Sequence, residues 1–171
     1  LGTGSLWTGL PFVAEQAELQ PILEDPQIEK IGQNIKYDQI VMRNQGVELR
    51  VVTFDSMVAS YLLDAGERVH NLDELAARYL NHTTIKIDSL IGSGKQQKRM
   101  DDVPIDKIAE YAAEDADVPL RLRPILDEKL RASELDTLFR DVEIPLIDVL
   151  SELEFNGIRV DVERLRALSE E

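Results

Sequence analysis

Only two short segments of this sequence have the pattern of β-strands, and helical patterns fill most of the rest. Residues 28–33 are apolar-rich, and residues 51–54 (Val-Val-Thr-Phe) are β-branched and aromatic, as buried strands are. About seven helical segments accompany them. Strands separated by helices are typical of parallel α/β sheets, yet two strands alone make a marginal sheet. The sequence therefore predicts a helix-rich α/β protein whose sheet is incomplete within these 171 residues.

The helices are predicted from apolar residues at helical spacing and from the signals at their ends. The expected ranges are 14–24, 37–44, 57–63, 71–80, 105–131 and 135–155, with a further helix after residue 161. Asp55, Asn71 and Asp161 are expected to cap the helices that follow them. Gly46 is expected to end the helix before it. Residues 81–104 are predicted to be irregular.

Three prolines fall inside the last two helical patterns. Pro119 and Pro124 predict a kink or break near 118–124, because each removes a backbone donor from the helix interior. Pro145 predicts an interruption in the helix that follows.

The composition excludes several classes of protein. Asp and Glu number 33 against 19 Lys and Arg, so the formal net charge is −14. Such a chain does not coat duplex DNA or an anionic membrane with a basic face, although an acidic metal site can still serve a nucleic-acid enzyme. Without cysteine, disulfide scaffolds, thiol catalysis and Cys-zinc sites are excluded. No apolar run approaches the roughly 20 residues of a membrane span, and no signal-peptide order is present, so we expect a cytoplasmic protein.

The first candidate site is Gly32-Gln33-Asn34-Ile35-Lys36-Tyr37-Asp38. It places two amides at the end of a predicted strand and a carboxylate at the start of the next helix. Open α/β sheets bind their ligands beyond the carboxyl ends of strands. Gln33 and Asn34 can hydrogen-bond a nucleotide there, and Asp38 can hold a hard cation. The alternative is that Asn34 or Asp38 only caps the helix.

The second candidate site is Tyr111-Ala112-Ala113-Glu114-Asp115. Tyr111 and Asp115 are four residues apart and share a helix face, where a carboxylate beside a phenol can bind a metal and orient a water. The alternative is a tyrosine at the core edge among solvated acids. In the basic loop 92–99, Lys95 can contact a phosphate backbone, or the loop is simply solvated.

Taken in order, these residues resemble the proofreading 3′–5′ exonuclease domain of bacterial DNA polymerase I. Residues 30–38 resemble the second exonuclease motif of that family, and residues 111–118 resemble its third, of the form Tyr-x-x-x-Asp. Further similar stretches are 46–50, 54–57, 70–76, 143–146 and 157–161. The resemblance covers about residues 15–171. It implies a ribonuclease-H-like (DnaQ-like) fold, with the exonuclease domain over 1–134 and the start of the polymerase domain over 135–171.

The first motif of that family, Asp-x-Glu, is absent from its expected place before Gln33. Asp141-Val142-Glu143 and Asp161-Val162-Glu163 have the right letters but follow the third motif. The chain starts without Met and stops within a helical pattern, so we expect a piece of a longer protein that begins after the first strands. Strand 28–33 would then be an exposed sheet edge, and because such edges recruit other chains, self-association is expected.

The resemblance implies hydrolysis of the 3′-terminal phosphodiester of single-stranded DNA with two Mg²⁺ ions, which Mn²⁺ can replace. Asp115 would hold the metal beside the attacking water, and Asp38 would help to hold the second. Tyr111 would orient the nucleophile, and Gln33 and Asn34 would contact the terminal nucleotides. Lacking the Asp-x-Glu ligands, the chain alone is expected to be inactive.

The implied partners are the 3′ end of DNA and the rest of the polymerase chain, in the bacterial cytoplasm at the nucleoid. Two alternatives stay open. One is an RNA exonuclease similar to ribonuclease D. The other is a non-catalytic, exonuclease-like spacer of a polymerase, although such spacers usually lose the acids that are present here.

Overall fold

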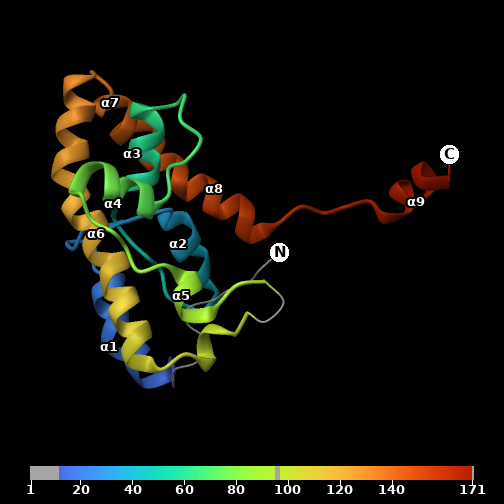
Figure 1. Cartoon of the computed structure of the whole chain (residues 1–171). Helices are drawn as coiled ribbons and strands as arrows, with labels where there is room; N and C mark the ends of the chain where they lie inside the picture. Colours follow the sequence, from blue (N-terminus) through green and yellow to red (C-terminus); the bar gives the residue numbers. More distant parts are fainter. Residues whose placement is uncertain (1–11, 95–96, 171) are drawn as a thin grey trace.

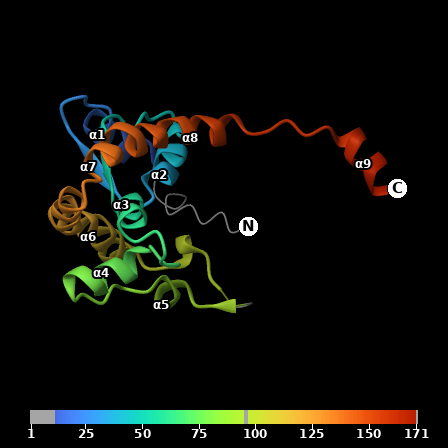
Figure 2. The ribbon, with the colours of Figure 1, turned by 90° about the horizontal axis from the view of Figure 1, so that it is seen from above.

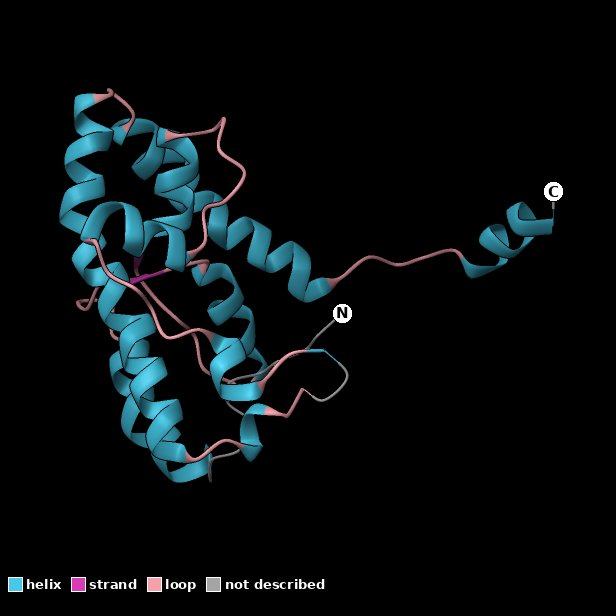
Figure 3. Ribbon diagram, viewed as in Figure 1, coloured by secondary structure: helices cyan, strands magenta, loops and turns pink. Residues whose placement is uncertain are grey.

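The structure is a computed structural model that describes residues 12–94 and 97–170. Its sheet consists of β1 (Lys30–Gly32) and β2 (Val52–Asp55), which pair in parallel with Gly32 beside Asp55. The described residues place no other strand beside β1. Figure 3 shows how little of the chain is strand. The predicted helix-rich α/β fold with a two-stranded parallel sheet is confirmed, whereas the predicted self-association stays a prediction.

The helices follow the predicted ranges closely. They are α1 (Phe12–Leu23), α2 (Ile35–Asn44), α3 (Ser56–Leu63), α4 (Leu72–Leu80), α5 (Ile87–Ile91), α6 (Ile105–Ala132), α7 (Asp136–Leu138), α8 (Ile144–Asn156) and α9 (Val162–Glu170), with a 3-10 turn at Met100–Asp102 and a π-helical turn at Phe139–Glu143 (Figure 1). The short α5 and the 3-10 turn lie in the segment predicted to be irregular.

Helix α6 is continuous over both of its prolines, so the predicted break is wrong, whereas a kink near 118–124 stays a prediction. The reason is packing: Pro119, Leu122 and Leu126 are fully buried, and α6 packs against α3 and α4 along this stretch. Burying that face offsets the hydrogen bonds that the prolines remove. The interruption at Pro145 is confirmed, because a π-helical turn precedes α8 and the proline stands in its first turn, where a missing N–H breaks no helical bond.

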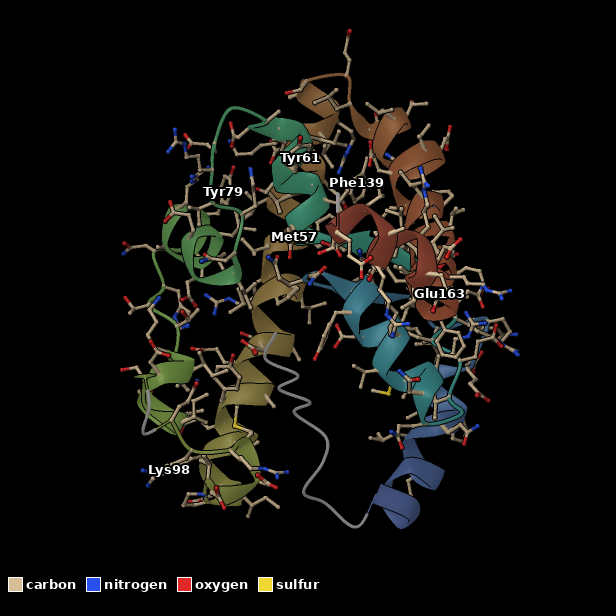
Figure 4. All side chains as sticks on the ribbon, turned by 90° about the vertical axis from the view of Figure 1, so that its right-hand side faces the viewer. Met57, Tyr61, Tyr79, Lys98, Phe139 and Glu163 are labelled. Carbon is tan, nitrogen blue, oxygen red and sulfur yellow. The ribbon has the colours of Figure 1, made fainter. Side chains whose placement is uncertain are left out.

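The hydrophobic core lies between β2, α3, α4, α6 and the segment from α7 to α8. Its buried members are Ile35, Phe54, Ala59, Leu75, Ala76, Val118, Leu122, Leu126, Leu130, Phe139, Ile144 and Ile147. The rings of Phe54 and Phe139 meet edge to face, with centroids 5.5 Å apart. Figure 4 labels Phe139 among the side chains. Residues after 134 therefore share one core with those before it, and the predicted domain boundary at 134/135 stays a prediction.

Beyond α8 the chain extends away from this core. Gly157, at φ 71°, ends α8, and the next residue, Ile158, is 92% exposed. Asp161 accepts a hydrogen bond from Arg164 N at 3.0 Å and caps α9, as predicted. Residues 157–161 and α9 together are called the arm, which stands off from the rest of the chain in Figure 2. Within the described ranges, no helix combines the length and apolar character that crossing a membrane requires.

Helix α2 ends, as predicted, at a glycine in the left-handed region. Gly46 has φ 78°, and its N–H donates to Arg43 O at 3.0 Å. Val47 N donates to Met42 O, also at 3.0 Å. This pair of bonds is the Schellman arrangement, in which glycine is favoured because it has no Cβ.

Helix α6 ends in the same arrangement but with Glu134 in the glycine position, at φ 58°. Leu135 N donates to Leu130 O at 2.8 Å and Glu134 N to Arg131 O at 3.1 Å. Left-handed backbone costs a residue with a Cβ about 1 kcal/mol or more. Glu134→Gly is therefore expected to raise the free energy of unfolding by about 1 kcal/mol in urea denaturation. Glu128→Gly, inside the same helix, is the control and should lower it by about 1 kcal/mol. A loss of stability at 134 would contradict this account.

Candidate active site

The structure places Asp38 and Asp115, which come from two different helices, near enough for the charge of Asp115 to act on Asp38. Asp38 lies in the first turn of α2, directly after β1, and Asp115 comes from α6, which packs beside β1. Burial raises the pKa of Asp38 to about 6, and the nearby charges of Asp55 and Asp115 add to the rise. The two carboxylates are therefore close enough to repel each other, at the edge where α/β sheets bind ligands.

Tyr111 and Asp115 interact directly, as their spacing predicts. The phenol hydroxyl donates a hydrogen bond to the carboxylate. Burial raises the pKa of Tyr111 to about 12, and the charge of Asp115 adds to it. Burial also raises the pKa of Asp115, although the bond from Tyr111 partly offsets this. Tyr111 thus stays a protonated phenol beside the Asp115 carboxylate.

Asp55 holds two helices at once. Its Oδ1 accepts from Met57 N at 2.8 Å and from Val58 N at 3.1 Å, which is the predicted cap of α3. Its Oδ2 accepts from Ile35 N at 2.8 Å and so also caps α2. Only 1% of Asp55 is exposed. Burial raises its pKa, and the backbone hydrogen bonds partly offset that rise. Sequence reasoning missed the cap of α2, which depends on Gly32 and Asp55 being neighbours across the sheet.

The two predicted nucleotide contacts differ in their surroundings. Gln33 uses both ends of its amide within the fold: Nε2 donates to His70 O at 2.8 Å, and Oε1 accepts from Ser56 Oγ. Asn34 occupies the N-cap position of α2 at φ 55°, but its side chain makes no capping hydrogen bond. Capping by the Asn34 side chain is thus not what the structure shows, since Asp55 does this work. That Gln33 and Asn34 contact nucleotides stays a prediction.

A second group of acids holds the segment after α4 against the same turn of α6. Glu114 Oε1 lies 2.7 Å from His82 Nε2, and Oε2 accepts from Ile85 N at 2.6 Å. The charges of Glu114 and Asp73 both raise the pKa of Asp115. Sequence reasoning missed this group because its members are far apart in the chain. Lys95, the predicted phosphate contact, lies outside the described residues.

The two later Asp-x-Glu sequences do not complete this site. The first, at 141–143, lies in the π-helical turn, and the second, at 161–163, lies in the arm. Among residues 12–94 and 97–170, no three or more Asp, Glu or His side chains are grouped closely enough to hold a metal. Asp38 and Asp115 nevertheless suit a hard cation, because Mg²⁺ prefers oxygen ligands and a positive charge would relieve their repulsion.

Replacing Asp38 by asparagine should reveal the cost of its buried charge, to which repulsion by Asp55 and Asp115 adds, as a dependence of stability on pH. A folded-state pKa of about 6, against an ordinary 3.8, means that the native state binds more protons than the unfolded state in that window. Stability then falls as pH rises through the window, and the penalty is complete above it. Each pKa unit corresponds to about 1.4 kcal/mol, and partial exposure of Asp38 reduces the total effect. Asp38→Asn should therefore raise the free energy of unfolding by roughly 2 kcal/mol near pH 7.5.

Near pH 4 the same substitution is expected to change the free energy of unfolding little, because Asp38 is then largely protonated in the native state. Urea denaturation at both pH values measures the difference. An equal gain at both would show that the charge of Asp38 is not the cause.

Comparison with known proteins agrees with this geometry. Residues 11–131 match a family model described as 3′-5′ exonuclease. DNA polymerase I of Pseudomonas aeruginosa is 43% identical over 156 residues, which are 90% of this chain and 17% of that protein. DNA polymerase I of Rhizobium leguminosarum is 40% identical over 171 residues, which are 100% of this chain and 17% of that protein. The chain thus spans about a sixth of the length of these relatives.

Solved structures show the same fold. The POL domain of Pol1 from M. smegmatis, in complex with DNA primer-template and dNTP, superposes with a TM-score of 0.74 at 28% identity, over 95% of this chain and 24% of that one. Brucella melitensis NrnC with bound Mg²⁺ has a TM-score of 0.65 at 23% identity, over 84% of this chain and 67% of that one. From the family match and the relatives together, the chain belongs to the 3′–5′ exonuclease family, in the form that bacterial DNA polymerase I contains.

Proposed function

We propose that this chain is the exonuclease part of a bacterial DNA polymerase I and takes part in removing nucleotides from the 3′ end of single-stranded DNA. The observation that supports this most strongly is the approach of Asp38, from α2, to Asp115, from α6, with Tyr111 bonded to Asp115. The relatives at 40% identity or more are DNA polymerases, which favours DNA over RNA as the substrate.

Each residue of this group has a chemical role in the proposal. Asp38 and Asp115 hold Mg²⁺, which when bound makes a coordinated water more acidic and stabilises charge on the phosphate. The raised pKa of Tyr111 keeps its phenol protonated. With its single proton directed to the Asp115 carboxylate, the phenol oxygen accepts a hydrogen bond from the attacking water and so orients it. Asn34 follows β1, and its side chain makes no helix cap, which supports the proposal that it contacts the terminal nucleotide.

Two features of the proposal extend beyond these residues. The proposal includes two Mg²⁺ ions, which Mn²⁺ can replace. Binding both ions needs the Asp-x-Glu motif, which the sequence lacks before Gln33. The remainder of the polymerase chain, acting at the nucleoid, is proposed to provide that motif. Self-association through the free edge of β1 is a further proposal for the isolated chain.

The experiment that tests the function joins this chain to the segment that precedes the matched region in the Pseudomonas aeruginosa relative. Release of nucleotides from 3′-labelled single-stranded DNA is then measured in Mg²⁺. Asp115→Ala in this chimera decides whether the chemistry depends on the proposed site.

A further inference from the structure

Gln39, the residue that follows Asp38, is held at both ends of its amide by helix α8. Its Nε2 donates to Asp148 Oδ1 at 2.7 Å, and its Oε1 accepts from Ser151 Oγ at 2.6 Å. Ser151 is buried, with 8% of its surface exposed. The amide therefore has one acceptor and one donor on the same helix, and they fix which way its oxygen and nitrogen point.

Two ion pairs also join α2 to α8, and they are exposed, as is the bond from Gln39 to Asp148, whereas the bond from Ser151 to Gln39 is partly buried. Lys36 pairs with Glu154, and Arg43 pairs with Glu152 and lies 3.9 Å from the centroid of the Phe155 ring. Exposed ion pairs contribute little to stability and are weakened by salt. Gln39 differs from these pairs in that one neutral side chain makes two hydrogen bonds to α8, one of them to the buried Ser151.

These contacts and Asp38 lie on different faces of α2. Positions 36, 39 and 43 have the spacing of one helix face, and this face packs on α8. Position 38 is rotated by about 100° around the helix axis from position 39 and so lies on another face. At its start, α2 is held by the hydrogen bond from Ile35 N to Asp55. Asp38 is therefore located between two anchors, one at the sheet and one at α8.

We propose that Gln39 is a positioning residue, which fixes Asp38 relative to Asp115 by holding α2 against α8 through both ends of its amide. The inference rests on the proposed function of Asp38 and Asp115 as metal ligands. It adds α8, a helix that supplies none of the proposed ligands, to the parts of the chain on which the site depends.

The test compares four variants of the 171-residue chain with wild type, under conditions where all of them are fully folded. Gln39→Leu keeps much of the side-chain volume and removes both hydrogen bonds. The double variant Gln39→Glu with Asp148→Asn exchanges the donor and the acceptor of the first hydrogen bond, because the amide at position 148 then donates to the carboxylate at position 39. Ser151 still donates to that carboxylate. The net charge of the chain is unchanged. The single variant Asp148→Asn retains an acceptor for Gln39 and controls for the altered charge.

Two measurements are made on each variant. Amide hydrogen exchange reports how firmly α2 is held, and Mn²⁺ binding, followed by electron paramagnetic resonance, reports on the carboxylates. Gln39→Leu should speed exchange within residues 37–42 about tenfold and leave residues 112–116 unchanged. It should weaken Mn²⁺ binding about tenfold, as loss of an outer-shell contact does. The double variant should restore both the exchange rate of residues 37–42 and the affinity for Mn²⁺ to within about twofold of wild type.

Arg43→Met is the matched control, because it breaks another contact with α8 one turn farther from Asp38. It should leave Mn²⁺ binding unchanged. The inference is overturned if Gln39→Leu leaves exchange in α2 unchanged, or if it speeds exchange without weakening Mn²⁺ binding. If the wild-type chain itself binds no Mn²⁺ at Asp38 and Asp115, the proposed metal site fails, and the exchange data with their rescue alone decide the positioning role.

Discussion

The 171-residue chain alone should release only background nucleotide from 3′-ended single-stranded DNA in Mg²⁺ or Mn²⁺, whereas the chimera with the preceding Pseudomonas aeruginosa segment should degrade it. The reason is the ligand set. Asp38 and Asp115 are two carboxylates, and the described residues bring no third metal ligand to them. Two ions cannot be held in line with the scissile bond by such a pair.

Within the chimera, Asp115→Ala should lower the rate about 10³-fold or more, because a metal clamp contributes several kcal/mol and each 1.4 kcal/mol is a factor of ten. Asp117→Ala is the matched control. Asp117 is on the same helix but exposed, and it pairs with Arg121 at 3.3 Å. Its loss should leave the rate within about twofold. Robust cleavage by the 171-residue chain, lost in Asp115→Ala, would refute the claim that the chain is catalytically incomplete.

Asp55→Ala should lower the free energy of unfolding by about 3 kcal/mol or more, the largest loss of stability we expect from a single substitution at the site. Three backbone donors lose their acceptor, on Ile35, Met57 and Val58, and each helix cap contributes about 1 kcal/mol or more. Asp55→Asn should be damaging too, because the amide nitrogen would face N–H donors of one helix. Urea denaturation measures both variants.

Asn71→Ala is the control for a single cap. Asn71 Oδ1 accepts only from Glu74 N, at 2.9 Å, at the start of α4. Asn71→Ala should therefore lower the free energy of unfolding by about 1 kcal/mol. An equal loss at positions 55 and 71 would mean that the bond from Asp55 to α2 adds no stability.

Much of the local structure could be predicted because its signals are local. The β-branched run before Asp55, the capping residues Asn71 and Asp161, and Gly46 each act within a few residues of their position in the chain. That Asp38 and Asp115 belong to one site is implied only by the resemblance to the exonuclease motifs, because nothing in the spacing of the two segments places α6 beside α2.

The remaining contacts could not be predicted, because their partners are distant in sequence. Glu114 meets His82 from 32 residues away, and Gln39 meets Asp148 from 109 residues away. Nothing in the residues near either one indicates a partner. The error at Pro119 has the opposite origin: the local rule is sound, but burial against α3 and α4 overrides it.

Helix α6 carries the proposed site residues and its buried residues in separate parts. The buried residues run from Val118 to Leu130, whereas Tyr111 and Asp115 lie before them, within 105–117, where no residue is buried. Local opening of the first three turns thus exposes little apolar surface and can occur while the core stays intact. A thermal melt of this protein mainly reports the second half of α6, so a screen for stability alone would pass variants whose site has been lost.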